Sequence, residues 1–158
     1  MQTWPADRVE RKPIADLVLA EANARTHSDA QVEEIAKSMT EWGWTNPVLV
    51  DESFTVIAGH GRLLAAQTLG ITEAPVMVAD GWTDAQCRAY AIADNQLAMN
   101  AGWDNDILKM ELKGLADWGF DVGLLGFDNL DELISGAKFD GGFTNQEQYE
   151  DRHLLLID

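Results

Sequence analysis

The chain has little positive charge and almost no cysteine. It carries 11 lysine and arginine residues against 27 aspartate and glutamate residues, a formal net charge of −16. Such a surface should repel nucleic acid and anionic membranes unless the basic residues are gathered in one patch, which counts against a free-standing DNA-binding protein. With Cys87 as the only cysteine, no intrachain disulfide can form, and nothing indicates an oxidising compartment.

Long apolar runs are also missing. No run approaches the roughly 18 residues of a membrane-spanning helix, and the start of the chain lacks the charged-then-apolar layout of a signal peptide. We therefore expect a cytoplasmic protein that has no membrane partner. A chain of 158 residues, of which 46% are hydrophobic, is large enough for one domain with a true core and an appended tail.

The stretch from Phe54 to Gly70 is the most informative part of the sequence. It predicts a short strand, a turn with glycines at positions 59 and 61, and a helix from Arg62 to Leu69. The glycines allow positive φ and close approach of a ligand, and the start of the helix offers unpaired N–H groups to an anion. Arg62 adds a planar fork of donors for phosphate oxygens. An ordinary strand-to-helix turn with a solvent-facing arginine is the alternative.

Two capping boxes predict further helices. Ser28 to Gln31 begins a helix that ends at Gly43, and Thr83 to Gln86 begins another that reaches about Ala93. In the second helix the spacing predicts an inward face made of Ala85, Ala89, Ile92 and Ala93.

Short apolar segments predict the strands. Residues 47–51 and 54–58 suggest a hairpin, and residues 75–79 return after the helix at 62–69, which implies a βαβ unit. Residues 14–20 predict an extended segment or one short strand. The expected fold class is therefore mixed α/β, a small mixed sheet with packed helices.

Beyond Asn95 the pattern becomes helical and then polar. We expect a helix over about 104–118, with Trp118 near its inward face, and a last short helix around Leu130 to Ile134. The composition after Phe139 is typical of a linker. This predicts a nucleotide-binding domain over 1–100, a helical extension packed on it over 101–138, and an acidic linker or tail over 139–158.

The order of these features resembles the N-terminal domain of ParB-type chromosome partition proteins, within the ParB/sulfiredoxin fold. The resemblance rests on Asn23-Ala24-Arg25, the capped helix with Asn46-Pro47-Val48-Leu49-Val50 after it, Val56 to Ala66, and Ala93-Asp94-Asn95. It implies a pocket for CTP or ATP, in which Gly59, His60, Gly61, Arg62 and Arg25 hold the phosphates. It also implies that Asp94 and Asn95 offer oxygen ligands to Mg²⁺, a hard ion that suits such donors.

The chain departs from the family pattern in the turn. Partition proteins usually have an acidic residue and a second arginine where this chain has His60 and Gly61, and a glutamate where it has Asp94. His60 could donate to a phosphate oxygen, carry a proton, or be a solvent-exposed turn residue. The turn contains no cysteine, so sulfiredoxin chemistry is rejected.

Three functions remain open. The preferred one is binding of a nucleoside triphosphate with Mg²⁺ in a DNA-modification or DNA-maintenance system, because residues 101–127 resemble the extension of ParB-like domains associated with phage DNA methyltransferases. DNA would then be contacted through a partner or fused domain, with a methyltransferase or a second copy of the chain as candidate partners. The alternatives are a phosphotransferase or nuclease, with His60 or Asp94 as the catalytic group, and a non-catalytic protein-interaction module.

Overall fold

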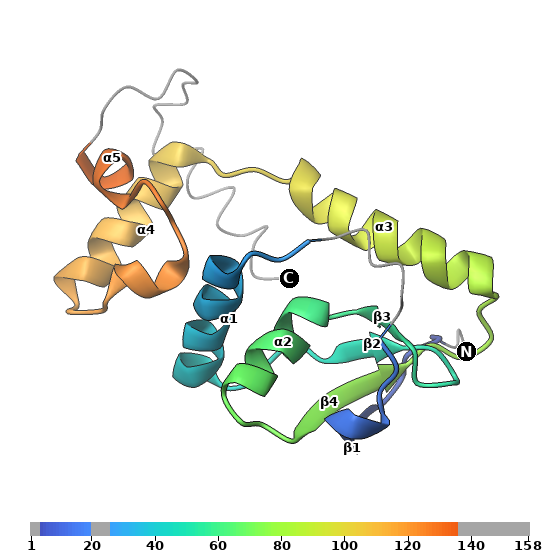
Figure 1. Cartoon of the computed structure of the whole chain (residues 1–158). Helices are drawn as coiled ribbons and strands as arrows, with labels where there is room; N and C mark the ends of the chain where they lie inside the picture. The colour runs from blue at the N-terminus through green and yellow to red at the C-terminus, as the bar shows by residue number, and fades with distance from the viewer. Residues whose placement is uncertain (1–3, 20–25, 136–158) are drawn as a thin grey trace. The chain divides into compact units, whose positions relative to one another are not determined.

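The structure, a computed structural model, describes residues 4–19 and 26–135 and divides the chain into two compact units, residues 1–101 and 102–158. The first unit holds, in chain order, β1 (Val9–Pro13), η1 (Ile14–Asp16), α1 (Asp29–Trp42), β2 (Val48–Val50), β3 (Val56–Ala58), α2 (His60–Thr68), β4 (Glu73–Val78) and α3 (Asp84–Asn100) (Figure 1). The second holds α4 (Asn105–Asp117), η2 (Val122–Leu125) and α5 (Leu130–Ser135). None of the helices in the described ranges could cross a bilayer.

The four strands form one mixed sheet in the order β1-β4-β2-β3. Strands β2 and β3 pair antiparallel, with Leu49 opposite Ala58, so the predicted hairpin is confirmed. Strand β4 is parallel to β2 and antiparallel to β1. The predicted βαβ unit is wrong in one respect: the strand directly before α2 is β3, whereas the parallel neighbour of β4 is β2. The hairpin reverses the chain before the helix, so β3 and β4 run in opposite directions.

The segment before α1 reaches both edges of the sheet. Strand β1 pairs with β4 at one edge, and Val18 forms an isolated parallel bridge to Thr55, next to β3 at the other edge. Of the two alternatives predicted for 14–20, the short strand is wrong, since the regular strand is Val9–Pro13 and Ile14–Asp16 is a 3-10 turn; Leu17 and Val18 are extended there. An exposed edge strand needs no apolar alternation, and the sequence of β1, Val-Glu-Arg-Lys-Pro, shows none.

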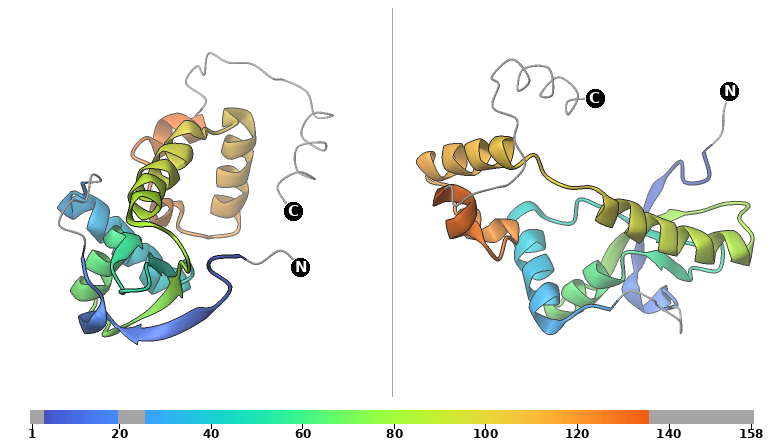
Figure 2. Two further views of the ribbon diagram at one scale, coloured as in Figure 1. Left: turned by 90° about the vertical axis from the view of Figure 1, so that its right-hand side faces the viewer. Right: turned by 90° about the horizontal axis from the view of Figure 1, so that it is seen from above.

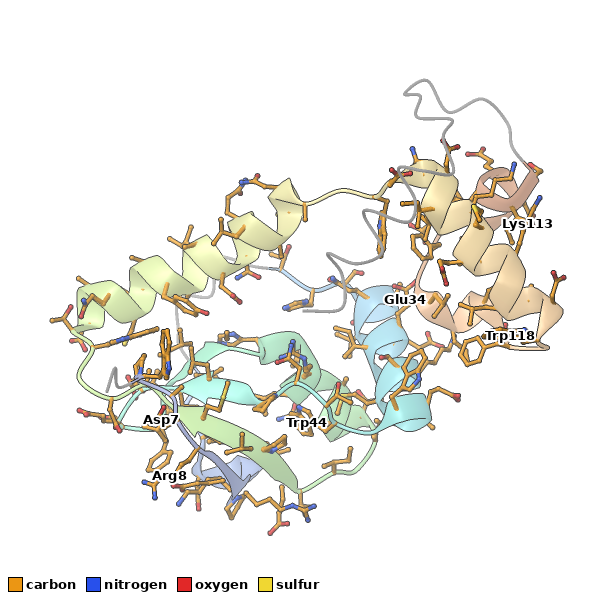
Figure 3. The ribbon with its side chains drawn as sticks, turned by 180° about the vertical axis from the view of Figure 1, so that it is seen from behind. Asp7, Arg8, Glu34, Trp44, Lys113 and Trp118 are labelled. Atoms are coloured by element: carbon orange, nitrogen blue, oxygen red, sulfur yellow. The ribbon has the colours of Figure 1, made fainter. Side chains whose placement is uncertain are left out.

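Helices cover the two faces of the sheet. Val48 and Val50 face α2 and pack with Leu63, and α1 packs beside α2 through Ala36 and Ala65. Figure 2 shows α1 and α2 side by side in both views. Trp44 contacts both of these apolar clusters and is labelled in Figure 3. Leu49 and Ile57 point to the opposite face, where α3 packs against them. Strand β2 is therefore buried on both sides, as its apolar sequence predicts.

Helix α3 is longer than predicted and presents a different face to the sheet. Cys87 and Ala91 pack against the core, whereas the predicted inward residues are exposed, with Ile92 at 62%. The helix has apolar or small residues on most of its sides, so the spacing of these residues does not determine which face is buried. Cys87 is half-buried and free, and burial, with nearby Asp51, raises the pKa of its thiol.

The second unit has a small core of its own, formed by Leu108, Leu112 and Leu133. The predicted inward position of Trp118 is wrong, because this side chain is 85% exposed. Helix α4 ends at Asp117, and Trp118 is its C-terminal cap, after which Gly119 turns the chain with φ of +81°. The packing of this unit on the first stays a prediction, and the predicted tail at 139–158 lies outside the described residues.

Candidate functional site

The turn between β3 and α2 is built on a glycine that no other residue could replace without strain. Gly59 is the N-cap of α2 and has φ of +110° and ψ of 15°, in the left-handed region. A Cβ atom at this position would lie 3.2 Å from Cγ2 and 3.3 Å from Cα of Val48 in β2. Strand β2 therefore sets how closely the turn approaches the sheet.

The second glycine brings the loop before α1 to the same turn. A Cβ atom on Gly61 would lie 2.9 Å from Cε1 of His27 and 3.0 Å from Cδ1 of Ile35 in α1. The His27 ring is held by a hydrogen bond between its Nδ1 and Oε1 of Gln31, at 3.2 Å. Sequence reasoning did not assign His27 to the site. The available signal was its position directly before the helix cap Ser28, combined with the packing of α1 on α2.

His60 is the first residue of α2, and its Nε2 atom is buried with no hydrogen-bond partner within the described residues. Burial lowers the pKa of this imidazole, and repulsion from His27 lowers it further. A buried polar nitrogen without a partner costs about 1–3 kcal/mol. The predicted alternative, a solvent-exposed turn residue, is therefore wrong for this atom, which lacks the partner that a buried polar atom usually has.

Arg62 and Asp94 belong to one electrostatic environment. Arg62 lies in the first turn of α2 and is half-buried; burial lowers the pKa of its guanidinium, and the Asp94 carboxylate opposes that shift. Asp94 is exposed and accepts a hydrogen bond from the Tyr90 hydroxyl at 3.4 Å. Helix α3 thus brings a carboxylate to the arginine of the turn, which joins two motifs that lie 32 positions apart in the printed sequence.

Asn95 does not converge with Asp94 on one point. Both residues lie inside α3, not at a corner after it, and consecutive residues on a helix point in different directions. The Asn95 amide donates to the Ala91 carbonyl at 2.7 Å. Within the described ranges no group of three histidine, cysteine or acidic side chains is placed to hold a metal ion. One carboxylate, such as that of Asp94, still fits Mg²⁺ when the remaining ligands are phosphate oxygens and water.

The assembled site consists of a glycine turn, the positive end of the nine-residue helix α2, one half-buried arginine and two neighbouring imidazoles. These groups favour an anion with several oxygens, because backbone N–H groups and a guanidinium both donate hydrogen bonds to negatively charged acceptors. Arg25, the remaining predicted phosphate ligand, lies outside the described residues.

Sequence comparisons match the first unit to known proteins. The model of the ParB N-terminal domain matches residues 2–96. The ParB-like nuclease domain-containing protein YnaK of Escherichia coli K12 is 46% identical over 79 residues, which are 50% of this chain and 91% of YnaK. The probable chromosome 2-partitioning protein ParB of Deinococcus radiodurans is 31% identical over 94 residues, which cover 57% of this chain but only 32% of that protein.

Among solved structures, this fold is similar to that of the C-terminally truncated chromosome-partitioning protein ParB from Caulobacter crescentus, crystallised with CTP-gamma-S. The TM-score is 0.60 at 22% sequence identity, and the match covers 83% of this chain and 72% of that one. This likeness confirms the predicted mixed α/β fold. Since the domain model covers more than half of the residues, the chain belongs to the ParB N-terminal domain family.

Proposed function

We propose that the first unit binds a nucleoside triphosphate, with the phosphates at the turn formed by Gly59, His60, Gly61 and Arg62. The observation that carries this proposal is the unpartnered Nε2 atom of His60 beside a half-buried arginine at the start of α2. A phosphate oxygen would accept hydrogen bonds from both groups. The complex of the Caulobacter ParB with CTP-gamma-S supports a nucleotide as the ligand class.

Asp94 is the proposed protein ligand for Mg²⁺. Its carboxylate is exposed and close enough to influence Arg62, so an ion held there would neutralise charge on the same phosphates. When bound, the ion would supply a compact positive charge beside the phosphates, in a chain whose net charge is −16. We assign Asn95 a supporting role, because its amide hydrogen bond to Ala91 fixes the turn of α3 that carries Asp94.

The test is calorimetry of the full chain with CTP, ATP and GTP in the presence of Mg²⁺. We expect one of the nucleotides to bind, and Arg62→Ala to weaken binding by about tenfold or more, the effect of losing a charge-assisted pair. Arg11→Ala is the matched control, since Arg11 is exposed on β1 and pairs only loosely with Glu73 at 3.9 Å. Asp94→Asn should weaken binding only when Mg²⁺ is present. Absence of binding at millimolar nucleotide would reject the proposal.

The cellular role proposed for this nucleotide site is in DNA maintenance or modification. Relatives of this chain include proteins named for chromosome partition and for nucleoid occlusion. Because the chain carries a net charge of −16, contact with DNA would go through a partner or a fused domain of opposite charge. A DNA pull-down with and without nucleotide tests this role, and direct, tight binding of DNA by the isolated chain would contradict it.

A second copy of the chain is a candidate partner at the outer face of α3. Ile92 and Met99, seven positions apart and so on one side of this helix, are 62% and 71% exposed, and the helix also carries Asp94. Burial of such apolar side chains between two copies would stabilise a dimer, and a nucleotide at Asp94 could alter that face. Sedimentation with and without nucleotide tests this step, and a monomer under both conditions would contradict it.

A further inference from the structure

A second pocket lies away from the glycine turn, where the chain enters β1 and leaves β4. Trp4, Pro5 and Asp7 line one side and Asp80 and Trp82 the other, around an open cavity of about 470 Å³. Asp7 is labelled in Figure 3 near the start of β1. Two tryptophans and two aspartates therefore line one cavity.

The walls of this pocket are held by specific contacts. The Asp80 backbone N–H donates to the Pro5 carbonyl at 3.1 Å, which ties the N-terminal segment to the end of β4. The Trp82 ring packs on the ring of Tyr90, with centroids 5.0 Å apart, and also against the apolar cluster on the α3 side of the sheet. Trp4, by contrast, is 64% exposed, so one indole is fixed and the other is open to solvent.

The two charged residues that line the pocket, Asp7 and Asp80, are both acidic. Asp7 and Asp80 are exposed, and the ion pairs within residues 4–19 and 26–135 involve neither of them. The carboxylate of Glu52, which accepts a hydrogen bond from the Gly81 N–H at 3.2 Å, adds a third negative group beside Asp80. A cation entering this pocket would meet carboxylates and the negative faces of aromatic rings together.

We propose that the pocket binds an arginine side chain from a basic segment of a protein partner. A guanidinium stacks on an indole face while its N–H fork pairs with a carboxylate, a combination that the rounder, more strongly hydrated lysine ammonium makes less well. The net charge of −16 favours a basic partner in general, and this pocket supplies the specific contacts.

Tyr90 links the pocket to the proposed nucleotide site, since its ring packs on Trp82 and its hydroxyl donates to Asp94. In the sheet register, Val50 pairs with Val78 near Asp80, whereas Gly59 lies against Val48 at the other end of β2. The glycine turn and the pocket thus lie toward opposite ends of the short strand β2. The substitutions tested below leave Trp82, Tyr90 and Asp94 unchanged, so nucleotide binding serves as the check that each variant is folded, together with circular dichroism.

The test uses the full chain and a short peptide in which arginine alternates with glycine, with its lysine and citrulline counterparts. Binding is followed by tryptophan fluorescence and by the indole N–H signals in nuclear magnetic resonance spectra. We expect Trp4→Ala, and the double variant Asp7→Asn with Asp80→Asn, each to weaken binding of the arginine peptide by about tenfold. The control double variant Asp16→Asn with Asp117→Asn removes the same charge at exposed positions elsewhere, and should change the affinity by less than about twofold.

Equal weakening by the pocket and control variants would overturn the proposal, because it would mean attraction by net charge alone. A lysine peptide that binds as tightly as the arginine peptide would overturn the assignment to arginine. Binding of the arginine peptide that leaves all indole N–H signals unchanged would place the contact elsewhere and would also overturn it.

Discussion

The Gly61 backbone lies directly against the imidazole of His27, so closely that a Cβ atom on Gly61 would be 2.9 Å from the His27 Cε1 atom. Gly61 is buried and helical, and at most helical positions alanine is about 1 kcal/mol better than glycine. We expect the contact with His27 to reverse that preference, which makes Gly61 a probe of the junction between α1 and α2.

The first prediction is that Gly61→Ala destabilises the protein. The methyl group would push on both His27 and Ile35, and overpacking of this kind costs about 1–3 kcal/mol. Urea unfolding measures the change. Gly114→Ala is the control, because this glycine lies inside α4 with no atom within 4 Å of the added methyl group, and it should be neutral or stabilising. Equal effects of the two changes would contradict the packing described for Gly61.

The second prediction concerns the cap of α2. Gly59→Ala should cost about 1–3 kcal/mol for the left-handed backbone, and more because the methyl group meets the Cα atom of Val48 at 3.3 Å. Gly70→Ala, after the same helix, has φ of +72° and open space around it. The difference between the two unfolding free energies reports the contact with β2 together with the added strain of a φ of +110° instead of +72°. If both substitutions cost the same, that contact contributes nothing.

The third prediction compares neighbouring leucines of α2. Leu63 is 2% exposed and packs between the helix and the sheet, so Leu63→Ala should cost about 2–5 kcal/mol. Leu64 is 38% exposed, and Leu64→Ala should cost about 1 kcal/mol or less. Thermal or urea unfolding of both variants checks the orientation of the helix, and a reversed order would mean that α2 presents its other face to the sheet.

The fourth prediction is a pH dependence of stability that comes from His60. Its pKa is lowered in the folded protein, so below about pH 6.5 the unfolded chain binds the proton first. The contribution of neutral His60 is therefore complete above about pH 6.5 and is lost as the pH falls through the lowered pKa.

Urea unfolding of the wild type and of His60→Gln, at several pH values between about 7.5 and 5, measures this effect. The wild type should lose more stability on acidification than the variant. Parallel curves would mean that His60 is as accessible to protons in the folded state as in the unfolded chain.

Much of the fold was predictable because its signals are local. The cap residues Ser28 and Thr83 located the starts of α1 and α3, although the predicted reciprocal box forms only at Thr83, since Gln31 bonds to His27. The glycine turn located the start of α2. The inward face of α3 was not predictable, since small and apolar residues surround the helix and only the sheet decides which of them it contacts. Strand β1 escaped prediction because its pairing depends on β4, more than 60 positions later in the printed sequence.

In the candidate site, too, local features could be predicted from the sequence and contacts between distant segments could not. The glycines and Arg62 could be assigned from their spacing, since the chemistry of an anion site needs those residue types next to each other. The proximity of His27 to Gly61 could not, because it results from the way two helices cross, and no short motif encodes that.

The short run from Val9 to Val18 closes the sheet at both of its borders, pairing with β4 on one and bridging to Thr55 on the other. Each of the strands β2, β3 and β4 pairs only with its neighbours in the sheet, so this run alone connects the two edges within the described residues. Removal of the chain up to Pro13, by a protease or by truncation, would therefore expose the unpaired backbone of β4 at one edge. It would also free the bridge at Val18 on the other edge from the strand that holds it. Such a shortened chain should aggregate through its exposed edge before its helices unfold.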